Sequence, residues 1–149
     1  LAAIIKNGEP PLVGAALTAL GKAGEEGLPL LRIAALEAAS DSRLAAVDAI
    51  GKVGGSKAIA LLGEVMLGAD RRAARAAASA LANLGGEART LLFSAALSER
   101  AQGSGALEQL AQLEGDDVDA VLVEVLAKGS AIDKRTVLPR FRPDTLPWK

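Results

Sequence analysis

A nine-residue pattern recurs four times along the chain at an almost constant interval. It reads Ala-Leu-Thr-Ala-Leu-Gly-Lys-Ala-Gly at 16–24 and returns, with apolar residues at the same places, at 46–54, 77–85 and 106–114. Its central apolar residues, here called the anchors, stand 30, 31 and 29 residues apart: Leu20, Ile50, Leu81 and Leu110. A fixed period of this length indicates a stacked array of units, each too small to bury its apolar face alone.

Each unit contains two helical patterns joined by short turns. In the second helix of a unit, apolar residues recur at the helical interval, as at Ala46, Val47, Ile50 and Val53, and not in the alternation of a strand. The first helix carries adjacent apolar residues at a constant place: Leu30-Leu31, Leu61-Leu62, Leu91-Leu92 and Val121-Leu122. We therefore expect an all-α fold of roughly ten helices, the first truncated at its start.

Glycine and polar residues mark where these helices begin and end. Glycines that follow the anchors predict helix ends in left-handed backbone geometry: Gly24, Gly54, Gly85 and, one position late, Gly115. Turn and N-cap residues stand between the two helices of each unit at 40–42, 68–70, 98–100 and 128–130. Asp116 and Asp117 favour the start of a helix, because carboxylates stabilise its positive end.

The pattern changes near the end of the chain. Leu138 takes the anchor position of a fifth unit and Phe141 the next core position, but Pro139 stands where earlier units have Gly or Ala. Because proline lacks the N–H that a helix needs, we expect the last helix to stop near Leu138. Residues 139–149 then form a proline-rich cap, with Trp148 folded over the last unit.

These motifs resemble the HEAT-like repeat family, in its short bacterial type related to the repeats of phycocyanobilin lyases, from Ala2 to about Phe141. The resemblance rests on the pattern Ala-x-x-x-Leu-Gly-x-x-Gly, found at 16–24 and, with Ile50 as anchor, at 46–54. It implies a right-handed α-solenoid, an armadillo-like superhelix, with about four and a half hairpins in one domain over 1–149. The family usually links its units through an Asp before the second helix and an Arg inside it; here only Asp70 and Arg43 hold those positions.

Some chemistry is excluded by the residue types that are missing. The chain has no His, no Cys and no Tyr, which removes the commonest general base, the thiol nucleophile and the usual transition-metal ligands. Carboxylates around the fourth anchor could act as an acid and base pair, hold a hard cation, or simply form a solvated turn: Glu108, Glu114, Asp116, Asp117, Asp119 and Glu124. We favour the solvated turn, and expect no enzymatic activity, no cofactor and no metal.

The second helices offer a surface for another protein, since the resemblance places them on the concave side. One row of side chains stands two residues after each anchor: Lys22, Lys52, Asn83, Gln112 and Arg140. The other stands two residues before it: Thr18, Asp48, Ser79, Glu108 and Thr136. Arg71, Arg72 and Arg75 form either a patch for a carboxylate or phosphate, or a polar helix face capped by Asp70. We expect a protein partner to contact Lys22, Asp48, Lys52, Arg72, Arg75, Ser79, Asn83, Glu108, Gln112 and Arg140.

Charge is divided unevenly along the chain. Residues 1–127 hold 11 Lys and Arg against 16 Asp and Glu, whereas 128–149 hold 6 against 2. An acidic body with a basic end could stack head to tail or bind an acidic surface. Nucleic acid fits poorly, because domains that bind it are usually strongly basic. No run approaches the roughly 18 apolar residues of a membrane span.

The sequence therefore predicts a non-catalytic scaffold for protein–protein interaction. The absence of cysteine fits a reducing compartment, and we expect a cytoplasmic location. The resemblance alone suggests a first alternative, an accessory subunit of a bilin (chromophore) lyase or a similar modifying enzyme. Because Leu1 begins within a helical pattern, a second alternative is a structural spacer within a longer solenoid.

Overall fold

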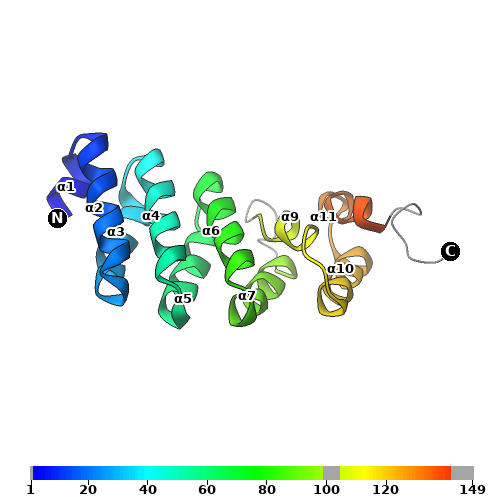
Figure 1. The fold of residues 1–149 in the computed structure, drawn as a ribbon. Coiled ribbons are helices and arrows are strands. Elements are labelled where there is room, and N and C mark those ends of the chain that lie inside the picture. Colours follow the sequence, from blue (N-terminus) through cyan, green and yellow to red (C-terminus); the bar gives the residue numbers. More distant parts are fainter. Residues whose placement is uncertain (1, 99–104, 142–149) are drawn as a thin grey trace.

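A computed structural model describes residues 2–98 and 105–141, and over these ranges the chain is all-helical, without strands (Figure 1). This confirms the predicted helix class. The elements are α1 (Ala2–Asn7), α2 (Pro10–Lys22), η1 (Gly24–Gly27), α3 (Leu28–Glu37), α4 (Ser40–Val53), α5 (Gly55–Met66), α6 (Arg71–Leu84), α7 (Gly86–Ala96), α9 (Ala106–Leu110), α10 (Asp116–Lys128), α11 (Ala131–Val137) and η2 (Leu138–Phe141). Within these helices, none is both long and apolar enough to cross a bilayer.

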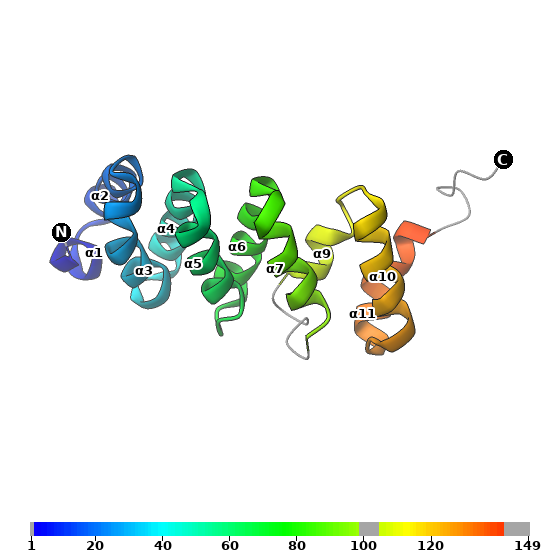
Figure 2. The same cartoon turned by 90° about the horizontal axis from the view of Figure 1, so that it is seen from below.

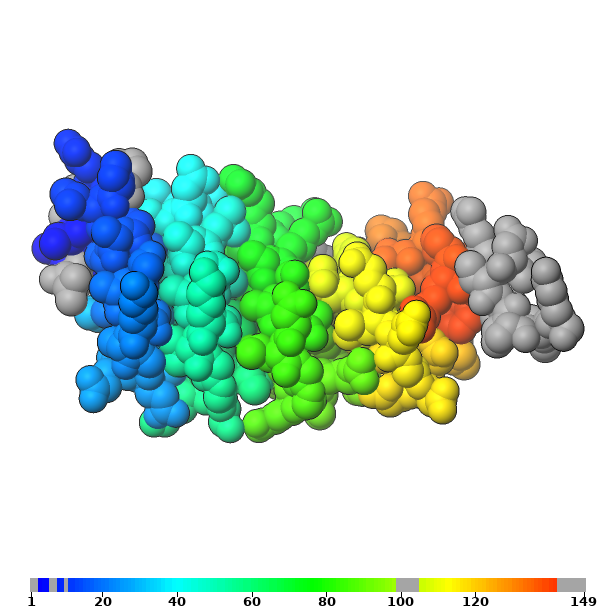
Figure 3. All heavy atoms as spheres, in the orientation of Figure 1, coloured from blue at the N-terminus to red at the C-terminus, as the bar shows by residue number. Residues whose placement is uncertain are grey.

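The helices lie in two rows along the length of the molecule (Figures 1 and 2). In the row that we call the B row, each helix contacts the next: α2, α4, α6, α9 and α11. The A row is built in the same way from α1, α3, α5, α7 and α10. Each helix of the A row also packs on the B-row helix that follows it in the chain. The result is an elongated series of helix pairs, in contact from blue to orange in the space-filling view (Figure 3).

The core runs between the two rows and contains the repeated apolar residues. The anchors are buried, with exposed fractions of 7% or less: Leu20, Ile50, Leu81 and Leu110. The second members of the apolar pairs are fully buried: Leu31, Leu62, Leu92 and Leu122. Burial of a leucine contributes about 1.5–3 kcal/mol, so each unit depends on this pair of positions.

Small residues let neighbouring helices of the B row approach closely. A Cβ added at Gly21 of α2 would lie 3.3 Å from the Cβ of Ala49 in α4. The same distance separates a Cβ added at Gly51 of α4 from the Cβ of Ala80 in α6. Because packed interiors leave no space for extra atoms, a larger side chain at either glycine would push two units apart.

Helix ends follow the predicted chemistry at most junctions. Gly54 and Gly85 end α4 and α6 with φ angles of 67° and 65°, a backbone geometry that favours glycine. Asp70 caps α6, and Ser130 caps α11 in a capping box. The prediction for 40–42 is wrong, because α4 starts at Ser40 and its N-cap is the residue before, which has no capping side chain. The predicted cap at 98–100 lies mostly outside the described residues.

The fifth unit differs from its prediction in one respect. α11 ends at Val137, so the expected stop near Leu138 is confirmed. Val137 is fully buried, whereas Leu138 is 55% exposed, so Leu138 is not the fifth anchor. The cause is the tighter 3-10 turn that begins at Leu138 and rotates its side chain away from the core face. Phe141 packs against the core as expected, and Trp148 lies outside the described residues.

Gly27 provides a test of this packing. It is buried in η1, and a methyl group added there would meet the carbonyl oxygen of Leu20. Because backbone atoms cannot yield without moving α2, we expect Gly27→Ala to lower the free energy of unfolding by about 1–3 kcal/mol. The matched control is Gly14→Ala in α2, where nothing lies within 4 Å of the added methyl, and we expect it to raise stability by about 0.5–1 kcal/mol. Urea unfolding measures both, and equal stability of the two variants would contradict the packing described.

Candidate functional site

The residues predicted to bind a partner lie mainly on the outer surface of the B row. Seven of them are exposed: Lys22, Asp48, Lys52, Arg72, Arg75, Asn83 and Gln112. Three are half-buried: Ser79, Glu108 and Arg140. Of their companions, exposed Thr18 donates a hydrogen bond to the Gly14 carbonyl, and half-buried Thr136 donates one to the Ile132 carbonyl. Exposure alone does not make a site, so the contacts of each residue decide its role.

Three of these residues surround a shallow groove between α4 and α6. Asp48 and Lys52 come from α4, and Asn83 comes from α6. The groove has a volume of about 240 Å³ and is lined by Asp48, Gly51, Lys52, Ala80, Asn83 and Leu84. The residues that let the two helices approach closely thus also line the groove. Sequence reasoning therefore brought together the correct side chains here.

The groove offers three kinds of polar group. The Lys52 Nζ lies 2.6 Å from the Asp48 Oδ2, and both side chains are largely exposed. Such a pair contributes little to stability, so both charges can exchange their contact for one with a partner. The Asn83 side chain has no hydrogen bond within the described ranges and can both donate and accept. The groove can therefore bind a polar surface of mixed charge, but it holds no nucleophile with an adjacent base.

Arg72 and Arg75 extend toward different neighbours. The Arg72 Nη1 lies 3.3 Å from the Ser40 Oγ and 4.0 Å from the Asp41 Oδ1, on the side of α4. The Arg75 Nη2 lies 3.7 Å from the Glu108 Oε1, on the side of α9. The two guanidinium groups therefore contact separate units and do not converge on one anion site. This arrangement matches the polar helix face that the sequence offered as the alternative.

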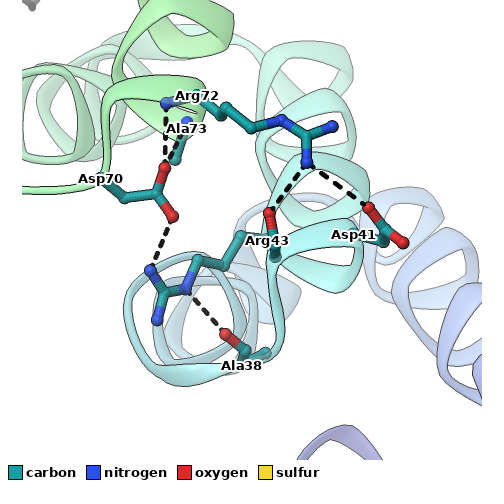
Figure 4. A network of polar contacts seen from close by, with 7 residues as sticks. Ala38, Asp41, Arg43, Asp70, Arg72 and Ala73 are labelled. Carbon is teal, nitrogen blue, oxygen red and sulfur yellow. Dashed lines mark hydrogen bonds and ion pairs between the residues drawn. The ribbon is translucent and has the colours of Figure 1, made fainter.

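Asp70 is the centre of a network that joins two units (Figure 4). Its Oδ1 accepts hydrogen bonds from the backbone N–H of Arg72, at 2.9 Å, and of Ala73, at 3.1 Å. Its Oδ2 lies 2.8 Å from the Arg43 Nη1, and the Arg43 Nε donates to the Ala38 carbonyl at 2.7 Å. The bond from Ala73, followed by those from Arg43 and Arg72, lowers the pKa of Asp70. The two positions at which the chain matches the HEAT-like pattern thus form one direct link between α4 and α6.

A series of polar contacts along the A row was missed by sequence reasoning. Each contact joins consecutive units: Glu25–Lys57, Arg32–Glu64, Ser56–Glu87 and Arg89–Asp117. The hydrogen bond from Arg32 lowers the pKa of Glu64, and the bond to Glu25 raises the pKa of Lys57. The partners stand 32, 32, 31 and 28 residues apart. Polar partners separated by one repeat period were the signal that could have identified them.

The carboxylates around the fourth anchor bind separate partners. Glu108 pairs with Arg75, Asp117 with Arg89, Asp119 with Arg140 and Glu124 with Lys128. No group of three or more possible metal ligands occurs among the described residues. The carboxylates are therefore distributed over several ion pairs, as the solvated-turn interpretation predicted.

Two residues of the predicted rows need correction. Arg140 lies in η2, where its Nε donates to the Asp119 Oδ1 at 2.9 Å and its Nη1 to the Ala111 carbonyl at 3.2 Å. It therefore links η2 to α10 and the end of α9, and is not part of a helix surface. Gln112 follows the end of α9 in a turn, because that helix stops at Leu110. The exposed surface of the B row is thus most regular over α2, α4 and α6.

A scan against protein-family models finds no match to the chain, and a search of curated proteins finds no similar sequence. The resemblance to HEAT-like repeats therefore stays a prediction that rests on the motifs quoted above.

The Asp70 network predicts a pH-dependent contribution to stability. Asp70→Ala removes the cap of α6 and the partner of Arg43, so we expect it to lower the free energy of unfolding by about 1–2 kcal/mol at neutral pH. Because the folded state lowers the pKa of Asp70 below its ordinary value of 3.8, this contribution is complete above that value. It is lost as the pH falls through the lower, folded pKa.

The matched control is Asp41→Ala. The Asp41 side chain is 97% exposed and only 4.0 Å from Arg72, so we expect almost no change. Urea unfolding of both variants at a series of pH values measures the effect. A difference between Asp70→Ala and the unchanged chain that stayed constant at acid pH would contradict the assigned role of the carboxylate.

Proposed function

We propose that the chain is a short right-handed α-solenoid of HEAT-like helical hairpins, an armadillo-like superhelix, and that it acts as a non-catalytic scaffold that binds another protein along the B row. The observation that carries this proposal is the groove between α4 and α6. There, Lys52 and Asn83, which occupy the same position in consecutive units, come together around one concave surface.

The arrangement of the B row supports an extended partner. α2, α4 and α6 lie side by side in contact, and each presents its polar residue two positions after the anchor: Lys22, Lys52 and Asn83. A partner that follows the row meets an equivalent position in each unit. Several modest contacts then add to a useful affinity without one dominant pocket.

The chemistry of the surface predicts how binding responds to salt. Within the described part of the B row there is no Trp or Tyr, the residues that most often dominate interfaces. Hydrogen bonds and ion pairs, such as those available to Lys52, Asp48 and Asn83, then supply the specificity. Because these charges are exposed, we expect affinity to fall as ionic strength rises.

A single substitution tests the position of the binding surface. Asn83→Arg fills the groove and changes its charge, so we expect a partner captured from the source organism to bind about tenfold more weakly, a loss of about 1.4 kcal/mol. The control is Thr90→Arg, which adds the same side chain at an exposed position of α7 in the A row, and should leave binding unchanged. Titration of the recovered partner against each immobilised variant gives the affinities.

The other outcomes separate this proposal from its alternatives. Equal loss of affinity in both variants would place the binding surface elsewhere. A saturable change in the absorbance of an added bilin would favour an accessory role in chromophore attachment. Failure to recover any saturable partner would favour a structural spacer, and measured turnover of a small molecule would contradict a non-catalytic role.

A further inference from the structure

The end of the B row at α2 carries an uncovered apolar stripe (Figure 1). The stripe consists of the residues eight, five and one positions before the anchor: Leu12, Ala15 and Ala19, all of them exposed. The corresponding residues of α4 and α6 are buried or half-buried: Ser42, Ala45, Ala49, Ala73, Ala76 and Ala80. In those helices the preceding B-row helix covers the stripe, as the contacts of Ala49 and Ala80 with Gly21 and Gly51 show. On α2 no described helix does so.

The opposite end of the molecule presents the complementary positions. Leu138 follows the buried Val137 as Gly21 and Gly51 follow their anchors, and these glycines face the next helix of the row. In the A row, Val123 follows a buried leucine as Gly63 does, and Gly63 faces Leu91 of the next unit. Leu138 and Val123 are 55% and 54% exposed. They are therefore surfaces of the kind that inner units use to contact their neighbours.

The polar link between units also has its two halves at the two ends. Glu9 is the N-cap residue of α2, as Asp70 is of α6, and Lys134 is the fourth residue of α11, as Arg43 is of α4. Asp70 and Arg43 form an ion pair at 2.8 Å. In the described ranges, the side chains of Glu9 and Lys134 have neither a hydrogen bond nor an ion pair. Their charges are opposite and occupy matching positions.

The apolar character of both ends makes an association more specific than a chance exposure. Terminal units of stacked arrays usually carry a polar outer face, because an apolar one is prone to association. Here the α2 end carries exposed Leu12 and the other end carries exposed Leu138 and Val123. On α2, the small side chains of Ala15 and Ala19 are one helical turn apart and leave room between them for a larger one.

We propose that a second copy of the chain docks head to tail, with the α2 end of one copy against the α11 end of the other. Leu138 of one copy packs between Ala15 and Ala19 of its neighbour, and Lys134 pairs with Glu9, in the manner of the contact between inner units. The two copies use different surfaces, so the contact is heterologous and continues into chains of copies unless it closes into a ring. It leaves the groove between α4 and α6 open, so it stands apart from the partner surface proposed above.

Sedimentation velocity tests the association with the 149-residue chain. We expect the average mass to rise continuously beyond that of a dimer between about 10 µM and about 1 mM, as for contacts of small area. Leu12→Glu and Leu138→Glu each block one end and should be monomeric alone. Mixed together, they should form a dimer and nothing larger, because each variant keeps one intact end. Leu67→Glu is the control, since Leu67 is an exposed leucine of the middle of the chain and should assemble like the unchanged protein.

A charge exchange tests the polar part of the contact. Glu9→Lys and Lys134→Glu should each weaken association about two- to five-fold, and the double variant should recover most of the loss. A chain that stays monomeric throughout, or a mixture of the two leucine variants without a dimer, would overturn the proposal. So would a monomer in which Leu138→Glu shifts the fluorescence of Trp148, the single tryptophan, because the terminus of the same chain would then occupy the surface.

Discussion

Close contact between successive helices of the B row is the constraint on which the other features depend. Gly21 against Ala49, and Gly51 against Ala80, leave no space for a larger side chain between α2, α4 and α6. Such contacts fix how far one helix is displaced from the next. With that displacement fixed, residues separated by one repeat period become neighbours in space, which produces both the polar groove and the ion pairs between units.

Apolar burial supplies most of the stability, and the polar links mainly select the register. Each fully buried leucine, such as Leu62 or Leu92, contributes about 1.5–3 kcal/mol. An exposed pair such as Arg32–Glu64 contributes at most about 1 kcal/mol. The Arg43–Asp70 pair is less exposed and is joined to backbone groups at both ends. Of these ion pairs, it is therefore the one best able to distinguish the observed alignment of two units from an alignment shifted by one residue.

Much of the helical arrangement could be predicted because period and pattern act locally. Anchors such as Ile50 and Leu81 lie in the core because residues at the helical interval share one face. The fifth anchor was wrong because a short helix followed by a 3-10 turn shifted the burial to Val137. The convergence of Asp48, Lys52 and Asn83 followed from their positions, whereas the divergence of Arg72 and Arg75 depends on which neighbour each long side chain reaches. Spacing within one helix carries no information on that choice.

The two rows differ in how their polar side chains are used, and this difference favours binding on the B row. Along the A row, Lys57 and Arg89 are held by carboxylates of adjacent units. On the B row, Lys22 and Asn83 have no hydrogen bond or ion pair in the described ranges, and the Lys52 contact is confined to its own helix. A partner on the A row would have to break contacts that join units, whereas a partner on the B row replaces only water. Binding along the B row therefore leaves the links between units intact.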